Sequence, residues 1–356
     1  MSIYTQKALD NGVVTGFASD FGPAWHQARL NVQQLKDLGR LYDGPVPTDV
    51  AETMIGWTPV VIEPGIIGTV QYGDDGTPEL TTFDLPDRLS KFIANPNTGR
   101  IVNIAGSGYN SDLHITMREA IQAAMDAEAD IASVVCLGDG AHMGMSFRAR
   151  DGVILGGEWG GAIPLVGFNS SLTGAIATQL DTSTTLRVCD NTMRMAAATA
   201  KRSLKVKRTR FSANKVTASA VREALEISFQ ETEDLVAELE RLANIDVNMK
   251  QLAQVLNTWK PIPDEDGRAK TIAENTQMAF IQEFNGTRNP FGLTVAGLWQ
   301  AHNTWAHWEQ TMRGMDGATA RLDRKAMRTA EGDVEDMDRK FMEIIAGVFD
   351  DVLVEA

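Results

Sequence analysis

One segment of this chain carries a dense run of positive charge that could bind phosphate groups. Between Arg187 and Arg222, ten Lys or Arg residues stand against a single acid, Asp190. Like charges at this density repel one another, and a nucleic-acid backbone is a common counter-charge that offsets the repulsion. The residues that we expect to contact nucleic acid are Arg187, Asn191, Arg194, Lys201, Arg202, Lys205, Lys207, Arg208, Arg210 and Lys215.

The residue types in this basic segment favour contacts to the backbone of DNA over contacts to its bases. Arg can make forked bonds to phosphate, and Asn191 could bond sugar or phosphate oxygens. Phe211 is the segment's one aromatic residue, so the segment offers little base stacking. The alternative is a solvated basic helix end and hairpin that only balances nearby carboxylates.

Patterns that carry enzyme chemistry are weak or missing. Gly106-Ser107-Gly108-Tyr109 lacks the third glycine of a dinucleotide fingerprint, and no Gly-Lys-Ser/Thr phosphate loop occurs. Asp139 and His142 could form an acid–base pair in a loop, but a strand turn with two exposed polar residues is the interpretation that we favour. His302 and His307 are five residues apart, so they diverge on a helix. We expect no catalytic residues, no cofactor and no metal site.

A Trp-rich stretch from Leu298 to Trp308 reads as an aromatic helix. Its indoles could stack bases, contact a partner protein or pack in the core. Core packing against the sheet is the interpretation that we favour. A protein partner could also use the acidic C-terminal tail, where nine carboxylates between Glu331 and Glu355 oppose only Arg339 and Lys340. Such tails are more often simply solubilising.

The composition indicates a folded protein with confined, not general, affinity for nucleic acid. The 356 residues are 43% hydrophobic, and the net charge is -14 with a pI near 4.9. An overall acidic surface excludes a histone-like coating protein. Cys136 and Cys189 sit in apolar, strand-like settings typical of core thiols in a reducing compartment. We find no signal segment and no long apolar run, so we expect a cytoplasmic protein, in the bacterial host cytoplasm.

Short apolar runs and turn signals predict antiparallel sheet in the first half of the chain. The runs at 58–62, 68–72, 100–104, 131–137, 141–149, 153–155, 163–168 and 184–189 are expected strands. Gly73–Gly76 and Asn95–Asn97 mark turns between them. One helix is expected from Thr116 to about Asp130, with Thr116 and Glu119 as a capping box.

The second half of the chain has helical periodicity. A helix or tandem pair begins near Val216 and breaks near Asn244–Asn248, and Thr271 with Glu274 opens another helix after the Pro261–Gly267 loop. Further helices are expected at 294–313 and over the apolar stripe from Phe341 to Val352. We therefore predict an α+β fold, with a sheet domain at 1–215, a helical region packed on it at 216–330, and an acidic helix or tail at 331–356.

Several stretches together resemble the phage/plasmid-like proteins, a prokaryotic family of unknown function. They are Ala24-Trp25-His26, the small polar run from Asn169 to Gly174, Leu186–Thr192 and Thr304–Trp308. The most specific, Arg-Val-Cys-Asp-Asn-Thr at 187–192, is one residue shorter than the family's usual Arg-Val-Val-Cys-x-Asn-Thr. The resemblance runs from about residue 20 to about 320, and it implies a protein of phages, prophages or plasmids.

Two hypotheses for function follow. The first is a non-catalytic, oligomeric DNA-binding protein that binds or anneals single strands in recombination or replication. The second is a protein-interaction module, such as an inhibitor of a host or defence factor, that does not bind nucleic acid. An enzyme with a pocket near Gly106–Tyr109 or Asp139 is a third, weaker hypothesis.

Overall fold

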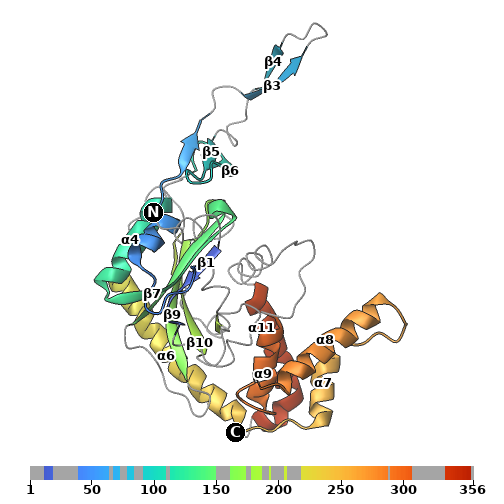
Figure 1. Cartoon of the computed structure of the whole chain (residues 1–356). Helices are drawn as coiled ribbons and strands as arrows, with labels where there is room; N and C mark the ends of the chain where they lie inside the picture. The colour runs from blue at the N-terminus through green and yellow to red at the C-terminus, as the bar shows by residue number, and fades with distance from the viewer. Residues whose placement is uncertain are drawn as a thin grey trace.

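The computed structural model combines an antiparallel sheet half with a helical half (Figure 1). It describes residues 12–18, 39–63, 67–72, 78–83, 91–109, 113–149, 161–173, 178–186, 192–193, 204–206, 218–287, 289–306 and 333–353. The predicted α+β class is confirmed. Among the expected strands, only the run at 153–155 lies wholly outside the described residues.

A seven-stranded antiparallel sheet forms the centre of the first half. Its order is β1-β7-β8-β9-β10-β11, with β12 also paired to β10. The strands are β1 (Gly12–Thr15), β7 (Ala129–Leu137), β8 (His142–Ala149), β9 (Ala162–Ser170), β10 (Thr178–Leu186), β11 (Thr192–Met193) and β12 (Leu204–Val206). Consecutive strands from β7 to β10 are neighbours, as in a meander, so short turns suffice to connect them.

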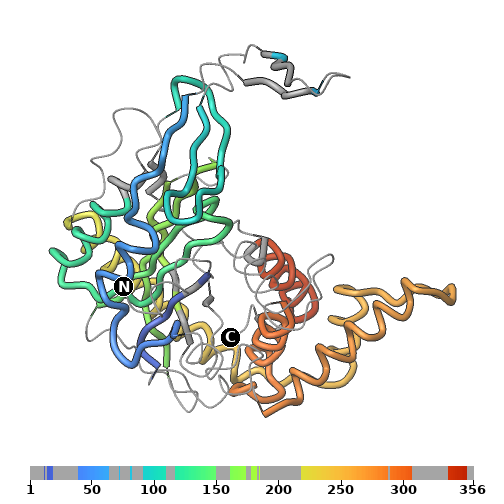
Figure 2. Tube along the Cα trace, turned by 45° about the horizontal axis from the view of Figure 1, so that its top comes forward, coloured from blue at the N-terminus to red at the C-terminus, as the bar shows by residue number. Residues whose placement is uncertain are grey.

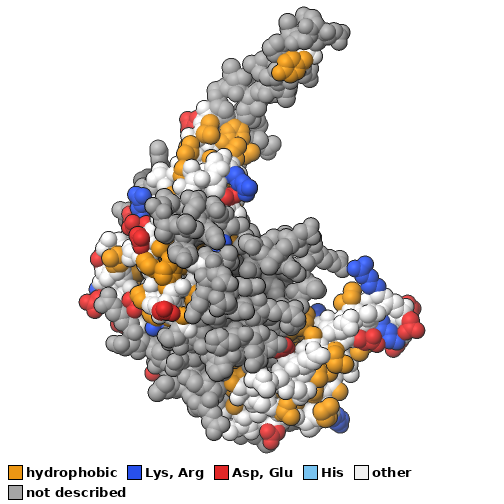
Figure 3. Space-filling view, viewed as in Figure 1, with side chains coloured by type: hydrophobic (Ala, Val, Ile, Leu, Met, Phe, Trp, Pro, Cys, Tyr) orange, Lys and Arg blue, Asp and Glu red, His pale blue; other side chains and the backbone are white. Residues whose placement is uncertain are grey.

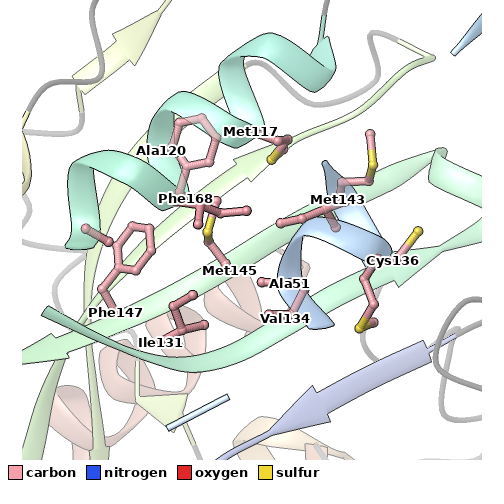
Figure 4. Packing of buried hydrophobic residues seen from close by; sticks show 14 of the residues in the cluster. Ala51, Met117, Ala120, Ile131, Val134, Cys136, Met143, Met145, Phe147 and Phe168 are labelled. Atoms are coloured by element: carbon pink, nitrogen blue, oxygen red, sulfur yellow. The ribbon is translucent and has the colours of Figure 1, made fainter. Parts of the chain in front are cut away.

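One face of this sheet is apolar and packs against helices. Val134, Met145 and Phe168 belong to this core, with Met117 and Ala120 of α4 (Leu113–Asp126) opposite them (Figure 4). The same cluster includes Met54 and Ile55 of α3 (Thr48–Ile55) and Val221 and Leu225 of α6 (Ala218–Ala243). Alternation along each strand sends the other side chains to the opposite face.

An arm of β structure projects from this body (Figure 1). Its base is a three-stranded sheet in the order β2-β5-β6, made of β2 (Val60–Ile62), β5 (Lys91–Ala94) and β6 (Ile101–Ala105). Its tip is the antiparallel pair of β3 (Ile67–Tyr72) and β4 (Pro78–Phe83), and the turn expected at Gly73–Gly76 lies outside the described residues. Asn95 forms the turn between β5 and β6 by accepting a bond from the Asn97 amide at 2.8 Å.

The helical half is built around a second core. Figure 2 shows its helices beside the sheet half, with α7 (Met249–Trp259) and α8 (Arg268–Phe284) extending outward as a pair. Leu239 and Leu242 of α6, Phe280 of α8, Trp299 of α9 (Val295–Thr304) and Phe341 of α11 (Asp333–Leu353) are all buried in this core. The predicted amphipathic helix at the acidic C-terminus is therefore confirmed, and its apolar stripe is packed.

The acidic helix α11 is fixed to α9 by a buried histidine. The imidazole of His302 stacks on the ring of Phe341, with centroids 4.1 Å apart, and its Nδ1 lies 3.0 Å from Oδ1 of Asp338. In its better-satisfied orientation, the amide of Asn303 also donates to the Asp338 carboxylate. The ring contact of Phe341 and the polar contacts of Asp338 therefore hold the same part of α11.

The structure corrects several expected details. The first half contains a second helix, α3, which was not expected from the sequence. It is a short amphipathic helix in a part of the chain that is rich in Gly and Pro. Helix α4 begins at Leu113, so Thr116 lies inside the helix and the capping box with Glu119 was wrong. Likewise α8 begins at Arg268, and Thr271 bonds back to Gly267 from within its first turn. Strand β10 begins at Thr178, six residues before the expected start, because polar Thr and Gln positions hid its alternation.

Truncation of the ring that holds α11 should weaken the fold. We expect Phe341→Ala to lower the free energy of unfolding by about 3–5 kcal/mol, because it leaves a cavity beside His302. The measurement is urea unfolding followed by far-UV circular dichroism. The exposed Glu343→Ala on the same helix is the control and should change little. Equal losses in the two variants would contradict the packing described.

Glu119 should make stability depend on pH. Burial raises the pKa of its carboxyl, and Oε2 has no hydrogen-bond partner among the described residues. The protonated form is therefore favoured on folding, and its stabilisation is present below the unfolded pKa and lost as pH rises through the higher folded pKa. Glu119→Gln should thus melt at a higher temperature than the wild type at neutral pH and at the same temperature in acid. The control Glu223→Gln should not show this convergence.

Candidate nucleic-acid interface

The predicted basic site lies almost entirely outside the described residues. Of its ten residues only Lys205 falls within the described chain, as part of the backbone of β12; the other nine are Arg187, Asn191, Arg194, Lys201, Arg202, Lys207, Arg208, Arg210 and Lys215. The predicted cluster of their side chains therefore stays a prediction. What the structure shows is where the described parts of this segment attach.

Two short strands join the basic segment to the edge of the large sheet. In β11, Thr192 and Met193 pair with Thr185 and Thr184 of β10. In β12, residues 204–206 pair with Thr178–Leu180 of the same strand. Residues 194–203 separate the two strands in sequence, whereas only residues 181–183 separate their partners on β10. The segment is thus fixed to one sheet edge at two places.

The backbone of Lys205 continues a polar row that crosses the sheet. Its register partner is Gln179, which pairs with Asn169 of β9, which in turn pairs with Gly144 of β8. On this same face Nε2 of Gln179 donates to Oδ2 of Asp181 at 2.7 Å. The sheet therefore has one apolar face against the helices, and its other face carries this row of small and polar residues beside the buried Ile163 and Leu165.

Asn169 is the most constrained side chain in this row. A Cβ at Gly144 would lie 2.5 Å from its Oδ1, so the glycine makes room for the amide. The residue is 8% exposed, and its Nδ2 has no hydrogen-bond partner among the described residues. A buried amide nitrogen without an acceptor is costly.

The helix side of β10 is held by hydroxyl contacts with α6. The hydroxyls of Thr184 and Thr232 lie 2.7 Å apart, and Thr182 donates to the carboxylate of Glu231. Ser228 adds a bond to the carbonyl oxygen of Leu165 at 2.9 Å. These contacts hold β9 and β10 against α6, and β10 is the strand that carries both β11 and β12.

The last cation of the basic run has a structural role. Arg222 lies in the first part of α6, and its guanidinium donates to the carbonyl oxygen of Asp126, the last residue of α4. A cation at the C-terminal end of a helix satisfies free carbonyl groups and interacts favourably with the helix dipole. Part of the positive charge is thus explained by helix capping.

The Asp139 turn is a structural feature in the described chain. Asp139 has φ of 58°, lies between two glycines with positive φ, and bonds Arg100 through Oδ2 at 3.2 Å. Its backbone carbonyl accepts a bond from the Asn95 amide at 3.1 Å. The expected turn is confirmed, but His142 was expected to be exposed and is 2% exposed, because β8 turns it inward.

The Trp-rich helix also serves the core. Trp299 and Trp305 are buried, and the rings of Trp259 and Trp305 meet edge to face at 4.8 Å. Burial in a core is confirmed for these two indoles, but the expected packing against the sheet was wrong, because both rings pack mainly among the helices. Trp308 and His307 lie outside the described residues. Nε2 of His302 is buried and has no partner among the described residues.

Within the described parts of the chain, His, Cys, Asp and Glu side chains form no group that could hold a metal ion. Over those residues, too, no helix combines the length and apolar character needed to cross a membrane.

Sequence reasoning missed the polar row, although a signal for it exists. Recognising the whole row requires the register of four strands, which no local pattern supplies. The signal is the alternation of small or polar residues with large apolar ones in β8 and β9, as in Gly144 against Met145 and Asn169 against Phe168.

The fit between Gly144 and Asn169 can be tested by a single methyl group. Gly144→Ala should lower the free energy of unfolding by about 1–3 kcal/mol, because the Cβ meets both Oδ1 of Asn169 and the Phe168 carbonyl oxygen. Chemical denaturation measures the change. Gly347→Ala in α11 is the control, since its Cβ meets nothing within 4 Å and alanine favours helix. A Gly144→Ala variant with an unchanged free energy of unfolding would show that the Asn169 amide is free to move.

Comparison with known proteins gives a family for this chain. Residues 116–336, more than half of the sequence, match the domain of unknown function DUF932. The match covers the chain from α4 to the start of α11 and so includes the sheet edge, the basic segment and most of the helical half. Searches of curated proteins and of solved structures gave no match. The chain belongs to the DUF932 family.

Proposed function

We propose that this chain is a DNA-binding protein of a phage or other mobile element, acting in the bacterial host cytoplasm. It binds single-stranded DNA through the basic segment and promotes annealing during recombination or replication. The observation that carries the proposal is the excess of ten cations over one acid between Arg187 and Arg222, in a chain whose net charge is -14. Phosphate is the ligand that this local charge suits best.

The sheet edge supports the proposal by giving the basic segment a fixed base. Strands β11 and β12 pair with β10, and β10 is bonded to α6 through Thr182 and Thr184. A rigid support lowers the entropy lost when cationic side chains bind a strand. Among the residue types in the segment, cations far outnumber aromatics, so we infer contacts to phosphates with little discrimination between base sequences.

Fluorescence anisotropy with labelled single- and double-stranded DNA tests the proposal. The variant replaces Lys205, Lys207, Arg208 and Arg210 by Ala. The wild type should prefer the single strand and bind more weakly as salt rises. If each of the four cations contacts one phosphate, the variant's slope of log affinity against log salt should be smaller by about 3 units, because each contact contributes about 0.7.

A control variant with the same change in net charge separates local from general electrostatics. It replaces four exposed cations of the helical half by Ala, namely Lys250, Arg268, Arg339 and Lys340. We expect it to bind DNA as the wild type does. Equal weakening by both variants, or wild-type binding that does not respond to salt, would contradict a site in the basic segment.

The second candidate function is a protein-interaction module that inhibits a host or defence factor. The observation that favours it is the exposed acidic side of α11, where Asp336, Glu343 and Asp350 face solvent while Phe341, Ile345 and Phe349 are buried. Spaced carboxylates on a helix could imitate the phosphates of DNA toward a DNA-binding partner. Failure of the wild type to bind any DNA in the anisotropy experiment would favour this function.

A further inference from the structure

The loop between α7 and α8 forms the outer end of the helical hairpin (Figures 1 and 2). Residues 261–269 are all exposed, and Figure 3 shows acidic side chains at this end of the hairpin. Asp266 precedes Gly267 here, and the side chain of Asp266 is 95% exposed. An aspartate followed by glycine can react without an enzyme, because its carboxyl group can join the amide nitrogen of the next residue.

The reaction converts aspartate into isoaspartate in two steps. First, the amide nitrogen of Gly267 attacks Cγ of the protonated Asp266 carboxyl group, and a succinimide ring closes as the amide proton and the carboxyl hydroxyl leave as water. Next, one water opens the ring at either of its carbonyl carbons. Opening at the main-chain carbonyl carbon leaves the peptide bond on the side-chain carbon, which is isoaspartate. The water lost equals the water gained, so the reaction needs neither an oxidant nor a reductant.

The backbone around Gly267 leaves the attacking nitrogen free. Glycine has no Cβ to hinder the approach, and a Cβ built at Gly267 would have nothing within 4 Å. Within the described chain the Gly267 amide donates to no acceptor, whereas its carbonyl oxygen accepts a bond from the Thr271 amide at 3.1 Å. The Asp266 carboxylate lies 2.8 Å from Nζ of Lys270, but a pair this exposed contributes little, because water competes with it. Both reacting groups are therefore accessible.

The sequence alone does not select this pair, because Asp precedes Gly at six places. The three pairs in the described chain begin at Asp43, Asp139 and Asp266, and the three outside it begin at Asp75, Asp151 and Asp316. Ring closure requires rotation about the backbone bonds between the aspartate and its glycine. A pair whose neighbouring backbone is hydrogen-bonded must therefore open locally before it reacts.

The pair at Asp43 lies between two bonded carbonyl groups. The carbonyl oxygen of Tyr42 accepts a bond from the Ala18 amide at 3.1 Å, and that of Gly44 accepts one from the Phe17 amide at 2.8 Å. Both bonds hold this turn against the residues that follow β1. Rotation at Asp43 would break at least one of them, so ring closure is opposed.

The pair at Asp139 is held by its side chain as well. That side chain is only 15% exposed, and Oδ2 bonds Arg100 at 3.2 Å. A Cβ at Gly140 would lie 2.8 Å from the Trp57 ring, so little room surrounds this glycine. Of the three described pairs, the one that begins at Asp266 is therefore the least restrained.

We propose that Asp266 isomerises spontaneously in the folded protein, with the Gly267 amide as the nucleophile and water as the other reactant. Gly267 is the N-cap of α8, so the product inserts one carbon atom into the backbone directly before that helix. The carboxylate that pairs with Lys270 becomes attached to Cα, which displaces it from the ammonium group. The product accumulates with time, and the reaction is independent of the basic segment and of DNA binding.

Incubation of the full chain in water enriched in heavy oxygen tests the proposal, because each ring opening adds one oxygen atom from the solvent. Peptide mapping by mass spectrometry measures the label at each aspartate, and electron-transfer fragmentation identifies isoaspartate. In the folded protein Asp266 should take up label at least about tenfold faster than Asp43 and Asp139, whose reaction first requires local opening. In urea the three rates should become similar. Equal rates at the three sites in the folded protein overturn the proposal.

Two controls use the same loop. Asp264 is also exposed but precedes Glu265, whose side chain hinders attack by its own amide nitrogen, so Asp264 should take up label much more slowly than Asp266. Asp266→Glu lengthens the side chain by one carbon and prevents closure of the five-membered ring. Isoaspartate should then disappear from this loop, while the melting temperature stays that of the wild type. Label at Asp264 as fast as at Asp266, or isoaspartate in this loop of the Asp266→Glu variant, overturns the proposal.

Discussion

The long helix α6 packs in both hydrophobic cores and so joins the sheet half to the helical half. Helix α6 has 26 residues, and it places Val221 and Leu225 in the core under the large sheet and Leu239 and Leu242 in the core of the helical half. Between these ends its hydroxyl and carboxylate groups bond β9 and β10. The position of the sheet edge, and of the helices beyond it, therefore depends on the straightness of α6. A break in this helix would uncouple the two cores.

Each face of the sheet has a different task, and this follows from alternation along the strands. The apolar face buries Val134, Met145 and Phe168 under α4 and α6, which supplies the hydrophobic stabilisation of the first half. The other face also buries Ile163 and Leu165 of β9, beside the row from Gly144 to Lys205. In that row Gly144 leaves room for the amide of Asn169. Gly144 stands opposite Asn169, where a side chain in place of the glycine would meet the amide.

The fold class was predictable because its signals are local, whereas the site depends on long-range geometry. The periodic apolar residues of α6, the Asn248 start of α7 and the stripe of α11 indicate helices without any tertiary information. The capping boxes at Thr116 and Thr271 failed because the structure begins both helices one turn earlier. The row from Gly144 to Lys205 joins residues far apart in sequence, so only strand register reveals it. The division at 215 and 330, like the contacts of the basic side chains, stays a prediction.

The interrupted edge formed by β11 and β12 also bears on how the family could diversify. Both strands pair with β10, and ten residues lie between them where the ladder needs about three. Insertions or deletions between Arg194 and Ser203 would change the length of that connection without shifting the register of any strand in the sheet. Relatives could therefore vary in the number of cations there while they keep the same framework.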